Sequence, residues 1–270
     1  MNNCPKISII MGIYTSKKKD MVKQAIQSII DQTFTEWEFV ICDDGSPDDT
    51  WEFLNKEYGY DPRFVLIRNE QNGGLRVALN TCLAASRADY VVRQDADDFS
   101  RKDRLEILYN YVLEHPEYDV VGTAMVSFDE NGEFGIVHPR KEYPKKIDFI
   151  HGTVVAHAST IMKKESLSVV NGYRVAWETT RCEDTDLYMR MCANGAKFYN
   201  LDEGLYYVRQ DREAYARKKY INRVKEATVK LKGFKTLKMP LWTYIFVLKP
   251  LIVGLIPQQL MRIIKKKMSK

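Results

Sequence analysis

The sequence lacks a cysteine framework. Its 270 residues include five cysteines, an odd number, and no two of them form a CxxC pair: Cys4, Cys42, Cys82, Cys182 and Cys192. This pattern argues against a disulfide scaffold and against a cysteine zinc site. Several of the cysteines lie in apolar runs, where a free thiol behaves as a small hydrophobe. We therefore expect a protein of a reducing, cytoplasmic compartment.

A secretory leader and a basic face are also missing from the sequence. The N-terminus has no basic segment followed by a long apolar run, so we expect no secretory signal. The net charge is +5, and much of the excess lies at the C-terminus, in residues 265–267 and Lys270. Nucleic-acid binding needs a basic stripe on the folded surface, so we expect no nucleic-acid partner. There is no internal repeat, and the composition fits one large globular domain, with or without a tail.

Strand and helix patterns alternate in the first part of the chain. Apolar and β-branched runs predict strands at Ile7–Ile13, Trp37–Cys42, Phe64–Arg68 and Tyr90–Arg93, and helical spacing predicts helices at Met21–Ile30, Trp51–Tyr58 and Leu75–Ala85. This alternation predicts a parallel sheet with helices on both faces. Ligands of such sheets bind beyond the carboxyl ends of the strands. The loops at Tyr14, Asp43–Asp44, Asn72–Gly73 and Asp95–Asp97 are expected on that rim.

The pattern changes after Asp98. We expect helices at Arg101–Glu114, Asp184–Ala193 and Arg217–Lys232, and strands at Asp119–Phe128, Phe198–Asn200 and Leu205–Arg209. The segment Phe134–Thr160 is expected to be irregular. The second half of the chain is therefore not a simple continuation of the alternating pattern.

The most informative motif is Gln94-Asp95-Ala96-Asp97-Asp98, which directly follows an apolar strand. In a strand, alternate side chains point to the same side, so Asp95 and Asp97 are expected to converge. Paired carboxylates are hard oxygen ligands that suit Mg²⁺ or Mn²⁺ together with substrate phosphates. A solvated acidic turn would produce the same short pattern, and Asp98 would also suit the N-terminus of a helix.

Six ordered segments together resemble the family 2 glycosyltransferases, which have the GT-A fold. These segments are residues 7–14, 28–34, 39–46, 69–80, 94–98 and 182–187. Each motif is weak alone, but six in the right order are strong. The resemblance implies a Rossmann-like α/β fold with a mixed central sheet and helices on both faces. One departure is Gly12, which stands where many members have proline or threonine.

The resemblance implies a site for a nucleotide-sugar donor. Ile13 and Tyr14 resemble the nucleotide-facing end of the first strand, and Asp44 resembles the carboxylate that holds the base, which implies UDP. Asn72 belongs to the glycine-containing loop, and Arg76 just after it could contact the diphosphate. Purely structural roles also fit these residues, since the pair Asp43–Asp44 suits an Asx-turn at Gly45 and Arg76 suits a solvated helix surface.

The remaining assignments concern the metal, the base and the acceptor. Asp97 is the expected direct metal ligand, and Asp95 is expected to reach the ribose or the ion. Asp184, with Glu183 second, resembles the general base, although both acids would also suit a helix N-terminus. His157 and Trp177 are candidates for acceptor contacts, while a structural histidine and a packing tryptophan are equally compatible with the sequence.

We expect one catalytic domain over residues 1–215, with a nucleotide-binding half (1–100) and an acceptor half (101–215), and a basic, amphipathic helical region over 216–270. In this last region, the apolar stretch 240–257 is interrupted by Lys249 and Pro250, which argues against a spanning helix. Trp242, Tyr244 and the basic end instead suit a helix lying in the membrane interface. An apolar hairpin packed on its own domain or on a second subunit is the alternative.

The sequence thus predicts an inverting glycosyltransferase that uses Mn²⁺ or Mg²⁺ and transfers a sugar from a nucleotide donor to a glycan or lipid-linked acceptor in surface polysaccharide synthesis. It would act in the cytoplasm, at the inner face of the cell membrane; association of identical copies is left open. One rival is a sugar nucleotidyltransferase, disfavoured because Ile13-Tyr14-Thr15-Ser16 stands where a phosphate loop would be. The other rival is a silent carbohydrate-binding or scaffold subunit, against which Asp95, Asp97 and Asp184 argue.

Overall fold

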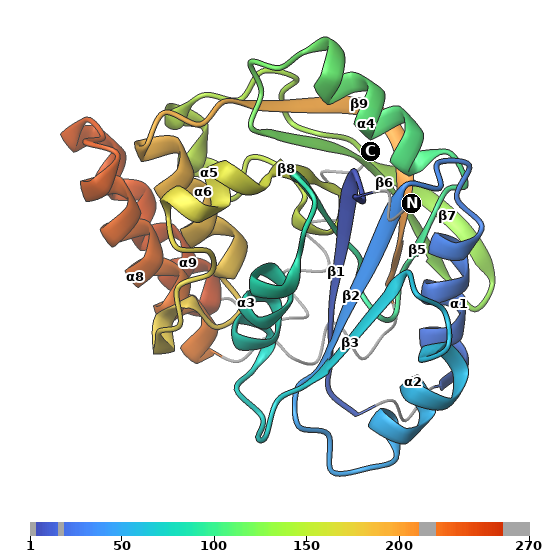
Figure 1. The fold of residues 1–270 in the computed structure, drawn as a ribbon. Coiled ribbons are helices and arrows are strands. Elements are labelled where there is room, and N and C mark those ends of the chain that lie inside the picture. The colour runs from blue at the N-terminus through green and yellow to red at the C-terminus, as the bar shows by residue number, and fades with distance from the viewer. Residues whose placement is uncertain (1–3, 16–18, 211–219, 256–270) are drawn as a thin grey trace.

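The computed structural model of the protein describes residues 4–15, 19–210 and 220–255. One mixed sheet runs through them in the order β3-β2-β1-β4-β8-β6-β9-β5, with β7 paired to β6 (Figure 1). The strands are β1 (Ile7–Ile13), β2 (Trp37–Asp43), β3 (Phe64–Arg68), β4 (Tyr90–Arg93), β5 (Phe99–Ser100), β6 (Val120–Asp129), β7 (Gly132–Val137), β8 (Ile161–Lys163) and β9 (Phe198–Arg209). The α-helices are α1 (Lys19–Ile30), α2 (Thr50–Tyr58), α3 (Leu75–Ala85), α4 (Arg104–Glu114), α5 (Lys164–Val169), α6 (Glu183–Ala193), α8 (Tyr220–Thr236) and α9 (Ile245–Leu255).

The first half is the expected parallel sheet. β1 lies between β2 and β4 and is parallel to both, and β3 adds to β2 in parallel. Side chains of β1 alternate between two buried clusters: Ile9 and Met11 join the residues of α1, whereas Ile10 joins those of α3. Because successive residues of a strand point to opposite faces, a continuously apolar strand needs a helix layer on each side. The prediction of helices on both faces is confirmed.

Mixed pairing begins at β8. This short strand runs antiparallel to both β4 and β6, and so joins the first half of the sheet to the second. β9 is parallel to β6, and β5 is antiparallel to β9. β5 directly follows the acidic motif, so its pairing with β9 fixes the far end of the loop that carries the three aspartates.

Two sequence-based expectations were wrong in detail. Phe198–Asn200 and Leu205–Arg209 are not separate strands but the two ends of β9. The charged Asp202–Glu203 segment between them resembles a turn, but irregular register against β6 absorbs these residues without ending the strand. The segment expected to be irregular, Phe134–Thr160, begins in β7 and contains 3-10 turns at Lys146–His151 (η1) and His157–Ser159 (η2).

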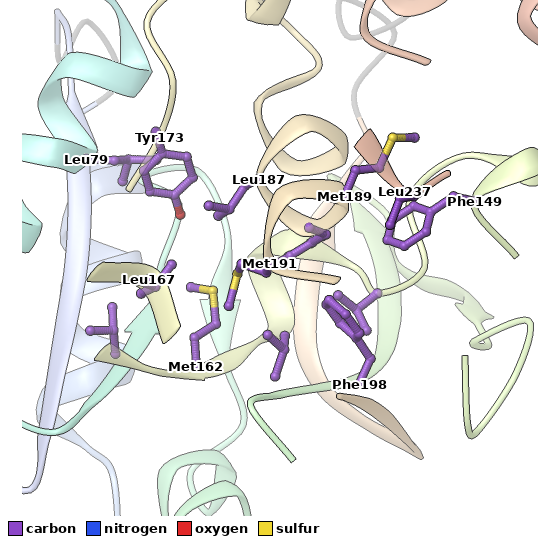
Figure 2. Packing of buried hydrophobic residues seen from close by; sticks show 14 of the residues in the cluster. Leu79, Phe149, Met162, Leu167, Tyr173, Leu187, Met189, Met191, Phe198 and Leu237 are labelled. Carbon is purple, nitrogen blue, oxygen red and sulfur yellow. The ribbon is translucent and has the colours of Figure 1, made fainter. Parts of the chain in front are cut away.

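The C-terminal helices pack beside α6. Figure 1 shows α8 and α9 side by side next to α6. Leu237, the residue after α8, belongs to the same buried cluster as Phe149, Met189 and Phe198 (Figure 2). Lys232 of α8 also donates a hydrogen bond of 2.6 Å to Glu178. The helices therefore contribute to the core that supports α6.

The outer face of α9 is apolar and exposed. Leu241, in the 3-10 turn η4 (Leu241–Tyr244) before the helix, is followed by Ile245, Leu248, Ile252 and Leu255 of α9 at alternating spacings of four and three residues. Each of the five is more than half exposed, as is Trp242 of the same turn. Such spacing places them along one stripe, which we call the α9 stripe. No helix in the described parts of the chain combines the length and hydropathy needed to cross a bilayer. The basic residues 265–267 lie outside the described residues.

We expect Gly12→Val to lower the free energy of unfolding by about 1–3 kcal/mol, the usual result of overpacking. A Cβ atom at Gly12 would lie 2.9 Å from the Cβ of Ala78 and 3.3 Å from Cδ1 of Leu75, so β1 and α3 would have to separate. Urea unfolding measures the change. Gly135→Val on the exposed strand β7 is the matched control, because nothing lies within 4 Å of its Cβ position. Equal stabilities of the two variants would contradict the close packing.

Candidate active site

A cavity of about 780 Å³ opens beyond the carboxyl end of β4, and we call it the cleft. Its lining comes from segments far apart in the sequence: Asp95 and Asp98 from the loop after β4, residues 137–158, and Arg181, Glu183 and Asp184 at the start of α6. Four of the predicted site residues therefore meet here, namely Asp95, His157, Glu183 and Asp184. Such gathering of polar side chains at a strand edge is the arrangement expected for a ligand site.

The acidic loop presents three different environments to its aspartates. Asp95 is half-buried and accepts a 2.7 Å hydrogen bond from Nη2 of Arg93. Asp97 is exposed, and its carbonyl oxygen accepts from Nε of Arg209. Asp98 is buried, and its Oδ1 accepts from the backbone N–H of Arg209 at 2.7 Å. Of the three, Asp95 and Asp97 are thus the more exposed.

Burial and mutual repulsion act strongly on Asp98. Burial, followed by the charges of Asp95 and Asp97, raises the pKa of Asp98 to about 8. The Arg209 N–H and the Tyr206 hydroxyl oppose this shift without cancelling it. A crowded acidic loop of this kind favours a nearby cation, because a positive charge would allow all three groups to ionise.

Two buried side chains, the amide of Gln94 and the guanidinium of Arg104, shape the acidic loop. Gln94 donates from Nε2 to the carbonyl oxygens of Asp95 and Asp98 and accepts from the Ser100 hydroxyl. Arg104 is fully buried and donates to Gln94 Oε1, to Ser100 Oγ and to the carbonyl oxygen of Arg93. Its guanidinium also lies 4.6 Å from the ring centroid of Tyr206. These bonds fix the backbone that aims the aspartates.

The donor set fits a hard divalent ion. The described residues contain no group of three or more histidine, cysteine, aspartate or glutamate side chains poised around one point. Mg²⁺ and Mn²⁺ commonly bind through one or two carboxylates and complete their shell with water and substrate phosphates. Asp97, with Asp95 beside it, offers such a partial set.

The second pair of acids begins α6. Glu183, Asp184 and Asp186 lie in the first turn, where negative charge interacts favourably with the helix dipole. Asp186 forms ion pairs with Arg174 and Arg190, with N–O distances of 2.5 and 2.8 Å. Asp184 instead accepts from the Thr185 N–H at 2.6 Å and faces the cleft together with Glu183. Asp186 is therefore neutralised within the fold, whereas Glu183 and Asp184 line the cleft.

The protonation of Asp184 suits a base. Burial raises its pKa, and the charge of Glu183 adds to the effect, so that the pKa of Asp184 is about 6. The Thr185 N–H and the charge of Arg93 hold it from rising further. A carboxylate with this pKa is ionised at neutral pH and still has useful proton affinity.

His157 does not offer a free ring nitrogen to the cleft. Its Nδ1 contacts Nη1 of Arg93, and its Nε2 lies 2.7 Å from the hydroxyl of Tyr173. Burial and Arg93 lower the pKa of His157 well below its usual value, so the ring is neutral. Its role as an acceptor ligand stays a prediction, and its observed partners are protein groups.

Asp43 and Asp44 form hydrogen bonds to different parts of the backbone. Oδ1 of Asp43 accepts from the Ser46 N–H at 3.0 Å and forms the expected turn. Asp44 accepts from the side chain of Asn69 and from the backbone N–H groups of Gly73 and Gly74, at 2.6–3.2 Å. A carboxylate has about four acceptor positions, so these bonds use most of its capacity. Asp44 thus holds the glycine loop, and base recognition by it stays a prediction.

The other predicted residues lie outside the lining of the cleft. Arg76 donates to the carbonyl oxygen of Ala176 and, at 2.8 Å, to Thr179 Oγ1, which ties α3 to the turn before α6. Ile13 is buried, Asn72 is exposed, and Tyr14 and Trp177 are about half exposed. Trp177 begins the 3-10 turn η3 (Trp177–Thr179).

Sequence reasoning missed Arg93, Tyr173 and Tyr206. For Arg93 a signal existed: an arginine ends an apolar strand two residues before Asp95, and such positions point to the same side. Tyr206 accepts from the Asp95 N–H at 3.0 Å and Tyr173 reaches His157. No local pattern marks these tyrosines, because their partners lie far away in the chain.

Comparison with known proteins agrees with the geometry. The family described as "Glycosyl transferase family 2" matches residues 8–170. A putative glycosyltransferase of Bacillus subtilis, EpsE, is 37% identical over 99% of this chain and 95% of its own length. A β-1,3-galactosyltransferase of Escherichia coli that uses UDP-Gal and a GlcNAc-diphosphoundecaprenol is 27% identical over 80% of this chain and 78% of its own length.

Solved structures show the same fold. Staphylococcus aureus TarS 1–349 with UDP-GlcNAc superimposes with a TM-score of 0.68 and 18% identity, covering 94% of this chain and 82% of TarS 1–349. The mannosyltransferase PcManGT of Pyrobaculum calidifontis, with GDP-Man and Mn²⁺, gives 0.65 and 16% over 94% of this chain and 76% of its own. The fold is GT-A. With the family match over more than half its length and a full-length relative at 37% identity, the chain belongs to glycosyltransferase family 2.

Proposed function

We propose that this glycosyltransferase moves a sugar from a UDP-sugar to a glycan or lipid-linked acceptor in surface polysaccharide synthesis, with inversion at the anomeric carbon. The observation that carries the proposal is the meeting of Asp95 and Asp98 with Glu183 and Asp184 in one cleft. One acidic group lies where a donor diphosphate and its cation would sit. The other lies where an acceptor hydroxyl would lose its proton.

In this proposal the donor is held by the rim of the parallel half. Ile13, Tyr14 and Asn72 border the nucleotide, Asp44 and its glycine loop face the base, and Arg76 reaches the diphosphate. Asp97 and Asp95 would hold Mn²⁺ or Mg²⁺, and the bound ion would stabilise the charge that develops on the leaving nucleoside diphosphate. Support comes from the acidic loop itself and from the TarS and PcManGT complexes, whose ligands are UDP-GlcNAc and GDP-Man with Mn²⁺.

Asp184 performs the proton step. Its carboxylate takes the proton of the acceptor hydroxyl as the oxygen forms a bond to the anomeric carbon, and the bond from that carbon to the diphosphate oxygen breaks. A base on the face opposite the leaving group makes this one direct displacement. The configuration therefore inverts, and an α-linked donor gives a β-linked product.

The acceptor occupies the part of the cleft formed by residues 137–158. This wall carries cationic and polar side chains, including Arg140 and Lys141, and belongs to the half of the chain expected to bind the acceptor. The galactosyltransferase relative of E. coli, by its name, acts on a diphosphoundecaprenol-linked sugar. A panel of nucleotide-sugars, assayed with Mn²⁺ for release of the nucleoside diphosphate, tests the function directly. Absence of turnover with every donor would overturn it.

The α9 stripe supports the membrane part of the proposal. Exposed leucine, isoleucine and tryptophan side chains along one helix face, followed in the sequence by Arg262 and residues 265–267, fit a helix that lies in the interface of an anionic bilayer. The protein would then work in the cytoplasm at the inner face of the cell membrane, where a lipid-linked acceptor is presented.

We expect Asp184→Asn to lower the turnover of donor and acceptor by about 10²–10⁴-fold, the usual contribution of a general base, while leaving donor affinity unchanged. The wild-type rate should fall below about pH 6, because protonated Asp184 cannot accept a proton. Glu183→Gln is the matched variant, since it changes the neighbouring acid of the cleft. A larger loss in Glu183→Gln than in Asp184→Asn would reverse the assignment of the base.

The same substitution should stabilise the fold. The raised pKa means that folded Asp184 holds its proton more tightly than in the unfolded chain, so its ionisation above about pH 6 costs stability. Asp184→Asn removes this cost, so we expect the variant to have a higher Tm than wild type at pH 7.5, by about 2–4 °C for each kcal/mol of stability gained. The difference in Tm should vanish as the pH approaches 4. Thermal unfolding at both pH values measures it.

Asp61→Asn is the control with the opposite sign. Hydrogen bonds from Arg63 lower the pKa of Asp61, so its ionised form favours the folded state. The Asp61 variant should gain no stability at neutral pH. If both variants changed Tm equally, the raised pKa of Asp184 would not be the cause.

Liposome flotation tests the membrane contact. The triple substitution Leu241→Ser, Ile245→Ser and Leu248→Ser should weaken binding to vesicles containing phosphatidylglycerol at least tenfold, because each buried leucine or isoleucine is worth about 1.5 kcal/mol or more. Tyr60→Ser, Leu113→Ser and Val169→Ser remove exposed apolar residues elsewhere and serve as the control. Equal flotation of all three proteins would show that the α9 stripe does not bind lipid.

A further inference from the structure

Arg93 is a buried arginine in the lining of the cleft. It is the last residue of β4 and is almost fully buried, yet it lines the cavity. Its Nη2 donates to Oδ1 of Asp95 at 2.7 Å, and its Nη1 contacts Nδ1 of His157. The Nε group is buried and has no hydrogen-bond partner among the residues that the structure describes. The direction of the guanidinium therefore depends on the two groups that hold its Nη atoms.

The partners of His157 fix its tautomer. A guanidinium has only donors, so Nδ1, facing Arg93, must be the unprotonated acceptor. The neutral ring then carries its proton on Nε2, which donates to the Tyr173 hydroxyl 2.7 Å away. The order of donation is thus Arg93 to His157 to Tyr173 at one end, and Arg93 to Asp95 at the other.

Tyr173, the last member of this row of hydrogen bonds, is held in place by its neighbours. Its backbone N–H donates to Oδ1 of Asn80, and its carbonyl oxygen accepts from Nδ2 of the same side chain, at 2.8 and 2.7 Å. Its ring belongs to the buried cluster that includes Leu79 and Leu187 (Figure 2). Residues of α3 and α6 therefore set where the Tyr173 hydroxyl lies.

The backbone around the other two members is also clamped. Nη2 of Arg104 donates to the carbonyl oxygens of both Arg93 and Ala158, at 3.0 Å each. The end of β4 and the turn that begins at His157 are thus joined through one buried side chain. The relative position of Arg93 and His157 is fixed without any contribution from a ligand.

Arg93 shares the cleft with both acidic groups. Its guanidinium donates to Asp95, and Glu183 and Asp184 at the start of α6 line the same cavity.

We propose that Arg93, His157 and Tyr173 form a positioning chain that orients the Asp95 carboxylate in the cleft. In this role His157 acts on Asp95 through Arg93. The chain rests on the proposed function, because it serves the carboxylate that helps to hold the ion and the donor. Groups that orient metal ligands in this way typically contribute about 10–100-fold to metal affinity or activity.

The test compares His157→Leu with His157→Asn. Asparagine keeps an acceptor near the position of Nδ1, whereas leucine keeps much of the volume and offers none. Mn²⁺ is titrated into the protein with UDP, and free Mn²⁺ is measured by electron paramagnetic resonance. We expect His157→Leu to weaken Mn²⁺ binding about 10–100-fold and to lower the kcat of UDP-sugar hydrolysis by a similar factor. His157→Asn should keep both quantities within about threefold of their wild-type values. His115→Asn, at the C-cap of α4 and outside the lining of the cleft, is the control.

A double-variant cycle sharpens the test. Arg93→Lys keeps the charge, but one ammonium group lacks the fork that reaches both Asp95 and His157. If the two residues act as one unit, adding His157→Leu to Arg93→Lys should produce no further loss of Mn²⁺ affinity. Additive losses would show that His157 acts independently of Arg93 and would overturn the proposal.

The remaining outcomes are also decisive. If His157→Leu does not fold, judged by circular dichroism, Tyr173→Phe replaces it, with an expected weakening of Mn²⁺ binding by about threefold to tenfold. A lower Tm with unchanged Mn²⁺ affinity and kcat would mean that the residues only support the fold. Wild-type protein that neither binds Mn²⁺ with UDP nor hydrolyses any UDP-sugar would overturn the proposed function itself. Active wild type with unaffected variants would overturn only the positioning role of Arg93, His157 and Tyr173.

Discussion

Two buried guanidinium groups hold an acidic loop at the edge of the sheet, and the rest of the site depends on this arrangement. Arg104 bonds to the backbone and to Gln94, which shape the loop, and Arg93 takes one oxygen of Asp95. A buried charge is costly unless it is paired or hydrogen-bonded, so each arginine restricts the geometry of its neighbours. The fold provides the partners: β4 and β5 set the ends of the loop, and β9 brings Tyr206 and Arg209 against it.

The cleft also concentrates charge that opposes folding. The raised pKa values of Asp98 and Asp184 show that both carboxylates are less stable when ionised in the folded chain than in water. Arg181, just before the acids of α6, has a φ of 68°, an uncommon conformation for a residue with a side chain. Such local conflicts gather at functional sites, where the surrounding structure is stable enough to tolerate them. A merely structural cluster of acids would have been neutralised, as Asp186 is by Arg174 and Arg190.

The sequence predicted the parallel half of the fold closely, because its information is local. β1, β3, β4 and α3 have the expected bounds, since a buried strand shows as an apolar run and the helix as a 3.6-residue period. Prediction weakened where pairing is distant. β9 looked like two strands because Asp202–Glu203 resembles a turn, and only its register against β6 shows that the strand continues. The gathering of Asp95 and Asp184 followed from motif order rather than from local pattern.

Side-chain partners were the least predictable feature, and the reason lies in how buried polar groups are satisfied. A buried nitrogen or oxygen must find a partner wherever the fold offers one. Asp44 accepts a hydrogen bond from the backbone of the neighbouring glycine loop, and Arg76 donates one to Thr179 of a distant turn. His157, for which the sequence allowed either an acceptor contact or a structural role, contacts Arg93 and Tyr173. The identity of a polar residue therefore indicates that it needs a partner, while the tertiary structure decides whether that partner is a ligand or another side chain that faces the ligand.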